Sequence, residues 1–293
     1  MEMQLEQKVV LVTGGSKGIG AAIVRAFCQE GARVANVNRP GPEGEELAAE
    51  AERAGQSYAF IQGDLTEWET SQRAVETVLD TWGRLDVLVN NAGVNDGVGL
   101  DQGPEAMWQS LQRNLVHYYA LAHYGLAELK RHQGAIVNIG SKVAVTGQGG
   151  TSGYAAAKGG VNALTREWAV DLASAGVRVN AVIPAETWTP LYDKWLQTME
   201  DPVAARAEIE QLIPLGQRFT TAEEIANMVV FLASSRSAHT TGQIIYVDGG
   251  YTHLDRKCTV SQPGITSELT GGVNERAVFA GTLPWVAAQD GPH

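Results

Sequence analysis

The chain has 293 residues, of which 44% are hydrophobic and 19% charged, and its formal net charge is −11. The apolar fraction excludes a disordered or fibrous chain, and the acidic balance argues against nucleic acid, because phosphate binding needs clustered Lys and Arg. No apolar run approaches the ~18 residues of a membrane span, and residues 1–8 lack the apolar stretch of a signal peptide. With only two cysteines, Cys28 and Cys258, we expect a soluble cytoplasmic protein that contacts no membrane.

Short apolar, β-branched runs alternate with longer amphipathic segments along the chain. The expected strands are residues 8–13, 33–37, 58–61, 85–90, 135–139, 177–182 and 243–247. The expected helices are residues 18–30, 43–54, 67–82, 103–131, 152–174 and 221–233. This alternation predicts a doubly wound, Rossmann-like α/β fold with a seven-stranded parallel sheet and helices on both faces, because parallel strands need crossover helices. We expect one domain over residues 1–256 and an irregular tail over residues 257–293.

A glycine-rich segment, TGGSKGIG, follows the first expected strand and leads directly into a helix. Glycines let the backbone turn tightly and approach a pyrophosphate, which then sits at the helix N-terminus. Strand, loop, helix and second strand form the context that this motif requires. The predicted dinucleotide-binding residues of this segment are Gly14, Ser16, Lys17, Gly18, Ile19 and Gly20.

The residues after the second and third strands bear on the choice of dinucleotide. A carboxylate after the second strand would bind the ribose 2′-hydroxyl, but this chain has Asn38 and Arg39 there. Arg39 and Lys17 can both reach a 2′-phosphate, which favours NADP over NAD. After the third strand, Asp64 could contact the adenine amino group, with Leu65 beside it, and a turn-forming role for Asp64 is the alternative.

Tyr154 and Lys158 are four residues apart and therefore share one face of a helix. An ammonium ~4 Å from a phenol interacts by about 4 kcal/mol at an effective dielectric near 20. This interaction would lower the tyrosine pKa from ~10 to about 7, so that Tyr154 could accept a proton from a substrate hydroxyl. Ser141 can hold the substrate oxygen in line with that transfer. A surface Tyr–Lys pair without a catalytic role is the alternative.

These motifs together resemble the short-chain dehydrogenase/reductase family over residues 7 to about 250. The resemblance rests on the TGGSKGIG loop, NNAG at residues 90–93, Ser141 and YAAAK at residues 154–158. It implies an NAD(P)-dependent oxidoreductase and a homo-oligomer, with a tetramer favoured. The catalytic set that it implies is Asn114, Ser141, Tyr154 and Lys158, with Asn114 anchoring a water that connects Lys158 to solvent. The further cofactor contacts that it implies are Asn91, Ala92, Gly93, Thr187 and Thr189.

The chain departs from the family where Pro184 is followed by Ala185 in place of the usual glycine. Alanine lacks the easy positive φ of glycine, so we expect a locally different backbone path in the loop that precedes Thr187 and Thr189.

The loops after the strands, where substrates bind in such a sheet, are rich in polar and aromatic side chains. Amides and carboxylates beside indole faces suit a small polyhydroxylated ring better than a steroid or an acyl chain. The predicted substrate-binding residues are Asn95, Ser141, Gln148, Tyr154, Glu186 and Trp188. For Asn95, turn formation is the alternative.

Longer strings, such as TGQGGTSGYAAAK and NAVIPAETWTPLY, resemble the bacterial L-fucose dehydrogenase branch of the family. This resemblance implies a small sugar substrate whose anomeric hydroxyl is oxidised to a lactone. D-arabinose and L-galactose, which match its ring stereochemistry, are alternatives.

Two other functions compete with a sugar dehydrogenase. One is an NADPH-dependent carbonyl reductase of 3-oxoacyl or hydroxysteroid type, which the polar loops disfavour. The other is a dinucleotide-binding sensor without turnover, which the complete catalytic set disfavours. His117, His123 and His132 lie at helical positions without clustered Cys or carboxylates, so we predict no metal site.

Overall fold

The computed structural model describes residues 2–254, so the expected tail over residues 257–293, together with Cys258, lies outside the described residues. Seven strands pair in parallel in the order β3-β2-β1-β4-β5-β6-β7. The strands are β1 (Val9–Thr13), β2 (Arg33–Asn38), β3 (Tyr58–Gln62), β4 (Val87–Asn90), β5 (Ala135–Ile139), β6 (Arg178–Pro184) and β7 (Ile244–Val247). The predicted Rossmann-like sheet is therefore confirmed.

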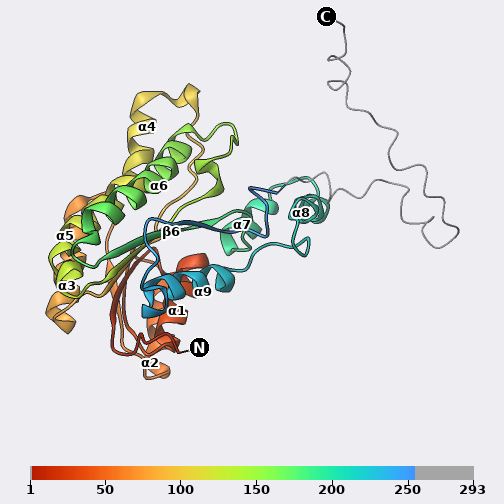
Figure 1. Ribbon diagram of the computed structural model, residues 1–293. Coiled ribbons are helices and arrows are strands. Elements are labelled where there is room, and N and C mark those ends of the chain that lie inside the picture. The colour runs from red at the N-terminus through yellow and green to blue at the C-terminus, as the bar shows by residue number, and fades with distance from the viewer. Residues whose placement is uncertain (1, 255–293) are drawn as a thin grey trace, which may run out of the picture. The chain divides into compact units, whose positions relative to one another are not determined.

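Helices cover both faces of the sheet (Figure 1). One face is covered by α1 (Gly18–Gln29), α2 (Pro42–Arg53) and α9 (Ala222–Ala233). The other is covered by α3 (Trp68–Trp82), α5 (His117–Arg131) and α6 (Ser152–Ala173). Alternate residues of β1 divide between the two cores, since Val10 and Val12 pack toward α1 and α9, whereas Val9 and Leu11 pack toward α3 and α5. Burial on both faces explains why the strands are almost continuously apolar.

The strand order reverses between β1 and β4. The connections that leave these two strands run to opposite sides, which opens a crevice at their carboxyl ends. The glycine-rich segment after β1 and the NNAG segment after β4 both begin at this point. The topology therefore brings the two motifs together.

The single helix expected over residues 103–131 is divided in the structure. It consists of α4 (Gly103–Leu111), a π-helical turn over Gln112–Val116 and α5. The turn carries Asn114, whose side-chain amide donates a hydrogen bond to the carbonyl of Ser110 at 3.0 Å. Such π-turns are frequent at functional sites, and apolar periodicity alone does not reveal them.

Two short helices follow β6 and were not expected from the sequence. They are α7 (Pro190–Leu196) and α8 (Pro202–Gln211), and each begins with proline after a capping side chain, Thr189 and Asp201 respectively. Because α8 buries none of its residues, it has no apolar stripe from which it could be predicted. Short 3-10 turns occur at Leu100–Gln102, Lys142–Ala144 and Ser235–Ser237.

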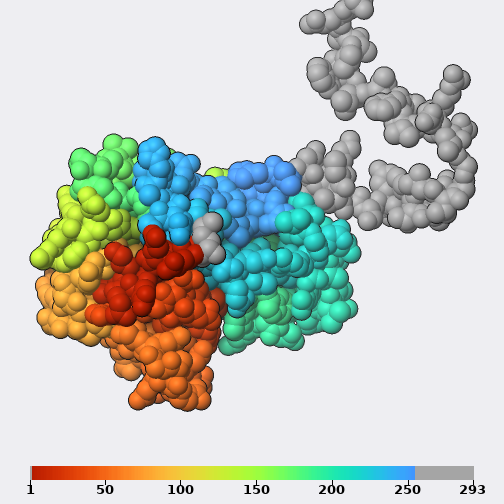
Figure 2. Space-filling model, turned by 60° about the horizontal axis from the view of Figure 1, so that its bottom comes forward, coloured from red at the N-terminus to blue at the C-terminus, as the bar shows by residue number. Residues whose placement is uncertain are grey.

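The N-terminal segment packs against the chain that follows α9, as the red and blue atoms of Figure 2 show. The Arg236 guanidinium donates a hydrogen bond to the carbonyl of Glu2 at 2.8 Å, and Ser235 contacts Gln4. Within residues 2–254, no helix combines the length and the apolar character needed to cross a membrane.

Candidate active site

The glycine loop is shaped by close contacts that a side chain would prevent. A Cβ added at Gly20 would lie 2.1 Å from the carbonyl oxygen of Gly14, and Gly14 itself has φ +65°. Helix α1 follows with Lys17 as N-cap, and neither a side-chain cap nor an acidic residue in the first turn occupies its N-terminus. The first N–H groups of α1 can therefore bind an anion. This arrangement fits the pyrophosphate of a dinucleotide.

Buried Asn36 on β2 holds the loop from behind. Its side-chain oxygen accepts a hydrogen bond from the backbone N–H of Gly15 at 2.7 Å, and its amide donates to the Ser16 hydroxyl at 3.1 Å. Asn36 is a site residue that the sequence motifs did not predict. A polar residue within the apolar run RVANV is the signal that could have revealed it.

Asn91, after β4, supports the same loop from the other side. Its side-chain amide donates hydrogen bonds to the carbonyls of Thr13 at 2.9 Å and Gly14 at 3.1 Å. The backbone N–H groups of Asn91 and Ala92 both donate to the Thr13 hydroxyl. The Asn91 side chain therefore joins the end of β4 to the loop that precedes α1.

A cleft of about 910 Å³ runs along this edge of the sheet. Most residues predicted to bind the dinucleotide line it: Gly14, Lys17, Gly18, Ile19, Gly20, Asn38, Arg39, Asp64, Leu65, Asn91, Ala92, Gly93, Tyr154, Lys158 and Thr189. Ser16 and Thr187 are not among its lining residues. Thr187 is buried, and its hydroxyl has no partner within residues 2–254. An unsatisfied buried hydroxyl is compatible with the predicted ligand contact.

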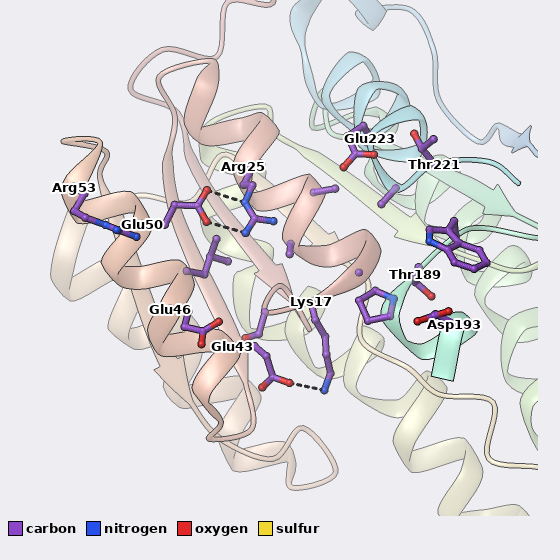
Figure 3. A pocket seen from close by; sticks show the side chains of 18 residues that line it. Lys17, Arg25, Glu43, Glu46, Glu50, Arg53, Thr189, Asp193, Thr221 and Glu223 are labelled. Atoms are coloured by element: carbon purple, nitrogen blue, oxygen red, sulfur yellow. Dashed lines mark hydrogen bonds and ion pairs between the residues drawn. The ribbon is translucent and has the colours of Figure 1, made fainter. Parts of the chain in front are cut away.

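Charges at one end of the cleft are already partly paired. The Lys17 ammonium lies 3.3 Å from a carboxylate oxygen of Glu43 on α2 (Figure 3). Asp64 accepts hydrogen bonds from the backbone N–H and the hydroxyl of Thr66, at 2.9 and 2.8 Å. Asp64 therefore forms the turn that the sequence left as an alternative, and it also lines the cleft. Arg39 is exposed beside it.

Lys158 on α6 is a buried ammonium with internal partners. It donates hydrogen bonds to the Tyr118 hydroxyl at 3.0 Å and to the carbonyl of Ile139 at 2.8 Å. Burial lowers the pKa of Lys158 to about 7, because desolvation disfavours the charged form. Tyr118 is fully buried on α5 and was not predicted, since it lies 40 residues from Lys158 in the chain.

The predicted lowering of the Tyr154 pKa is wrong for this structure. Burial raises the pKa of Tyr154 above its ordinary value, and a hydrogen bond with Ser141 opposes that effect. The Lys158 nitrogen lies 5.6 Å from the centroid of the Tyr154 ring, and its N–H groups point to Tyr118 and Ile139. Desolvation of the phenol therefore exceeds the electrostatic effect expected from the helix spacing.

Asn114 is fully buried and holds the loop after β4 in place. Its side-chain oxygen accepts a hydrogen bond from the backbone N–H of Val94 at 2.7 Å. A Cβ added at Gly93 would lie 3.0 Å from that oxygen and 3.4 Å from the Lys158 nitrogen. The absence of a side chain at Gly93 thus lets the side chains of Asn114 and Lys158 both lie close to its backbone. All four predicted catalytic residues lie around the carboxyl ends of β4 and β5 and the first turns of α6.

A charged cluster lies between the residue after Ser141 and the loop after β6. Lys142 and Glu186 form an ion pair, and both side chains are largely buried. The Tyr192 hydroxyl, on α7, donates to Glu186 at 2.7 Å, and the Lys142 nitrogen lies 4.1 Å from the centroid of the Tyr251 ring. Glu186 was predicted to contact substrate, whereas Lys142 was not. Their 44-residue separation explains why the pair was not found in the sequence.

The remaining predicted substrate residues are placed differently. Trp188 lines a second cavity, of about 880 Å³ between α1, α2 and the loop before α7, which Figure 3 shows. The Arg206 guanidinium lies 4.1 Å from its ring centroid, and Phe219 contacts its edge. Trp188 is not among the lining residues of the cleft that Tyr154 lines, and its contact with substrate stays a prediction. Asn95 accepts a hydrogen bond from the Gly97 N–H at 3.4 Å, as in a turn, and Gln148 is exposed.

No group of three or more His, Cys, Asp or Glu side chains that could hold a metal ion occurs within residues 2–254. His117 is buried on the first turn of α5 and belongs to no such group within these residues.

A family model described as enoyl-(acyl carrier protein) reductase matches residues 14–252. The chain belongs to the short-chain dehydrogenase/reductase family. Members of this family are NAD(P)-dependent oxidoreductases that act on CH–OH groups, and the open N-terminus of α1 fits such a dinucleotide. The predicted enzyme class is confirmed.

Relatives within the family have different named substrates. The chain is 38% identical over 269 residues to L-fucose dehydrogenase from Mus musculus, and the match covers 91% of this chain and 97% of that protein. It is also 38% identical over 250 residues to 3-oxoacyl-acyl-carrier-protein reductase from Thermotoga maritima, which covers 85% of this chain and 99% of that protein.

Solved structures agree with the fold. Cj0485 dehydrogenase has a TM-score of 0.83 at 43% identity, covering 88% of this chain and 98% of its own. Ligand-free aldohexose dehydrogenase from Thermoplasma acidophilum has a TM-score of 0.78 at 30% identity, covering 90% of this chain and 100% of its own.

Substitution of Gly20 tests the loop in this short-chain dehydrogenase. We expect Gly20→Ala to weaken dinucleotide binding at least about tenfold, because the added Cβ would displace the Gly14 backbone from which α1 and the loop take their positions. Isothermal titration with NADP and NAD measures the effect. Gly159→Ala is the matched control, since its Cβ would meet no atom within 4 Å, and it should bind as the wild type does. Equal affinities of the two variants would contradict the proposed loop contact.

Proposed function

We propose that this enzyme oxidises a hydroxyl of a small sugar, L-fucose or a stereochemically related aldose, to the lactone. The observation that carries the proposal is the Lys142–Glu186–Tyr192 cluster beside Ser141. An acyl chain or a steroid at this position could offer no hydrogen bond to these two charged groups and the hydroxyl. A polyhydroxylated ring can instead exchange hydrogen bonds with them.

The residues around Tyr154 divide the proton chemistry among them. NAD(P), when bound, supplies the acceptor for the hydride that leaves the carbon bearing the hydroxyl. Because its raised pKa keeps the Tyr154 phenol protonated, Tyr154 takes the substrate hydroxyl proton as its own proton moves on toward the neutral amine of Lys158, and Ser141 holds the substrate oxygen through its own hydroxyl. Lys158 and Tyr118 form a hydrogen-bonded pair behind Tyr154, through which the proton can pass on. Asn114 keeps Gly93 and Val94 in place beside Lys158.

The comparisons support this proposal and also favour a second candidate. An L-fucose dehydrogenase and an aldohexose dehydrogenase are among the relatives. The 3-oxoacyl-acyl-carrier-protein reductase has the same 38% identity as the first of these, so reduction of a 3-oxoacyl thioester by NADPH is the alternative.

Two finer features belong to the proposal. We infer a preference for NADP over NAD from Arg39 and Lys17 at the end of the cleft, although Glu43 shares the Lys17 charge. We also infer a cytoplasmic homo-oligomer, with a tetramer favoured. Apolar side chains exposed on adjacent helices support the assembly, since Tyr119 on α5 and Val170 on α6 are 57% and 81% exposed. Analytical ultracentrifugation tests the oligomeric state.

A substrate panel tests the reaction. Initial rates of NADPH and NADH formation should be measured with L-fucose, D-arabinose, L-galactose, a secondary alcohol and a hydroxysteroid, and the reverse reaction with a 3-oxoacyl thioester. We expect turnover with L-fucose or a related aldose, and a higher kcat/KM with NADP than with NAD. Glu186→Gln should raise the sugar KM, because the amide cannot keep the ion pair with Lys142. Activity on the thioester or steroid, with none on any sugar, would overturn the substrate proposal and leave the family assignment intact.

A further inference from the structure

His117 is a buried side chain in the wall of the dinucleotide cleft that the reaction described above does not use. It occupies the first position of α5, directly after the π-helical turn that carries Asn114. It is 1% exposed, yet its side of the helix faces the cleft, together with Arg113 one turn earlier. Asp64 and Lys158, which line the same cleft, both influence its pKa.

The hydrogen bonding of the ring determines its tautomer. His117 Nε2 lies 3.0 Å from the carbonyl oxygen of Arg113. A carbonyl oxygen only accepts, so Nε2 carries the hydrogen of the neutral ring. Burial lowers the pKa of His117 to about 4, which keeps the ring neutral at physiological pH. His117 Nδ1 is therefore an acceptor with a free lone pair.

No residue within 2–254 donates a hydrogen bond to Nδ1, although the atom is buried. An unsatisfied buried acceptor is costly and uncommon in folded proteins. Nε2 bonds to the helix backbone and His117 lines the cleft, so Nδ1 is the polar atom of the ring that remains for a ligand. The ligand that belongs in this cleft carries ribose hydroxyls and amino groups, all of which can donate.

We propose that Nδ1 of His117 accepts a hydrogen bond from an O–H or N–H donor of the bound dinucleotide. His117 is then a cofactor-binding residue that the glycine loop and the catalytic motif do not predict. The inference rests on the family's use of NAD(P) and is independent of the sugar substrate. It assigns a function to a buried histidine on the first turn of α5.

Two substitutions separate the ligand contact from the structural one. In His117→Asn, the side-chain oxygen takes the place of Nδ1 as an acceptor, whereas the bond to Arg113 is lost. In His117→Gln, the amide nitrogen takes the place of Nε2 and keeps the bond to Arg113, but no acceptor remains at Nδ1. Thermal unfolding of both variants first establishes that each is folded.

Equilibrium titration with NADP, NAD and ADP-ribose then measures affinity without turnover. We expect His117→Gln to weaken binding of the full dinucleotide about tenfold, the effect of one lost hydrogen bond to a buried acceptor, and His117→Asn to bind nearly as the wild type does. ADP-ribose locates the donor, because it keeps the adenine and both riboses and lacks only the nicotinamide ring. Its binding is weakened equally if the donor is the adenine amino group or a ribose hydroxyl, and is unaffected if the donor is the nicotinamide carboxamide. Unchanged affinity in His117→Gln, or a loss in His117→Asn alone, would overturn the proposal.

Discussion

Tyr154→Phe is expected to lower kcat by about 100- to 10,000-fold, the range that one positioned acid–base group contributes. The substitution removes only the hydroxyl that accepts the substrate proton and that hydrogen bonds with Ser141. The ring remains, so the dinucleotide dissociation constant should be nearly unchanged. Steady-state kinetics with the best substrate of the panel, together with a dinucleotide titration, make the measurement.

Tyr119→Phe is the matched control for this experiment. Tyr119 lies on α5 with its ring exposed and contacts His123 and Trp168 rather than the cleft. We expect removal of its hydroxyl to leave kcat unchanged. Near-normal turnover after Tyr154→Phe would show that another group is the base, and equal losses in both variants would show a general effect on the fold.

Lys158→Met is expected to abolish most turnover and at the same time to stabilise the protein at pH 7. Burial lowers the pKa of Lys158 from 10.5 to about 7, so the folded state holds this ammonium at a cost. Each unit of pKa corresponds to about 1.4 kcal/mol, so the free energy of unfolding at pH 7 should rise by on the order of 4 kcal/mol when the amine is removed. The Tyr118 hydroxyl still donates to the Ile139 carbonyl, so that oxygen keeps a partner.

The pH dependence gives this prediction its sign. Between pH 7 and 10.5 the unfolded wild-type chain binds more protons at Lys158 than the folded chain does, so wild-type stability rises with pH across that window. The difference in the free energy of unfolding between Lys158→Met and the wild type should therefore be largest at or below pH 7 and vanish near pH 10.5. Urea unfolding at pH 7 and pH 10 measures it. Lys130→Met, at an exposed position of α5, should change neither stability nor turnover.

A Lys158→Met variant that is less stable than the wild type at pH 7 would contradict the prediction. In that case the hydrogen bonds of the ammonium to Tyr118 and Ile139 would outweigh its desolvation.

Much of the candidate site could be predicted from local sequence patterns. The glycine loop is a local turn, and Tyr154 and Lys158 are one helical turn apart, so neighbouring residues define both features. The seven strands were predicted within about two residues of their observed ends, because burial on both faces makes each an apolar run. The order of the motifs along the chain then indicated the family.

The features that the sequence analysis missed depend on long-range contacts. Lys158 meets Tyr118 across 40 residues, and Lys142 meets Glu186 across 44, distances over which no periodicity links the partners. The indole of Trp188 follows a strand as a substrate residue would, yet packing against Arg206 and Phe219 places it in the second cavity. Sequence alone cannot tell which way such a side chain turns.

The amino-acid sequence by itself determined the fold class and the dinucleotide motif and predicted the catalytic side chains, because each depends on residue type and short spacing. The tertiary structure alone decided the electrostatics. Spacing placed a charge beside a phenol and predicted a lowered Tyr154 pKa, whereas folding buried both groups and turned the ammonium toward Tyr118 and Ile139. A pKa depends on solvent exclusion and on the partners that the whole fold brings together, and neither is encoded in a spacing of four residues.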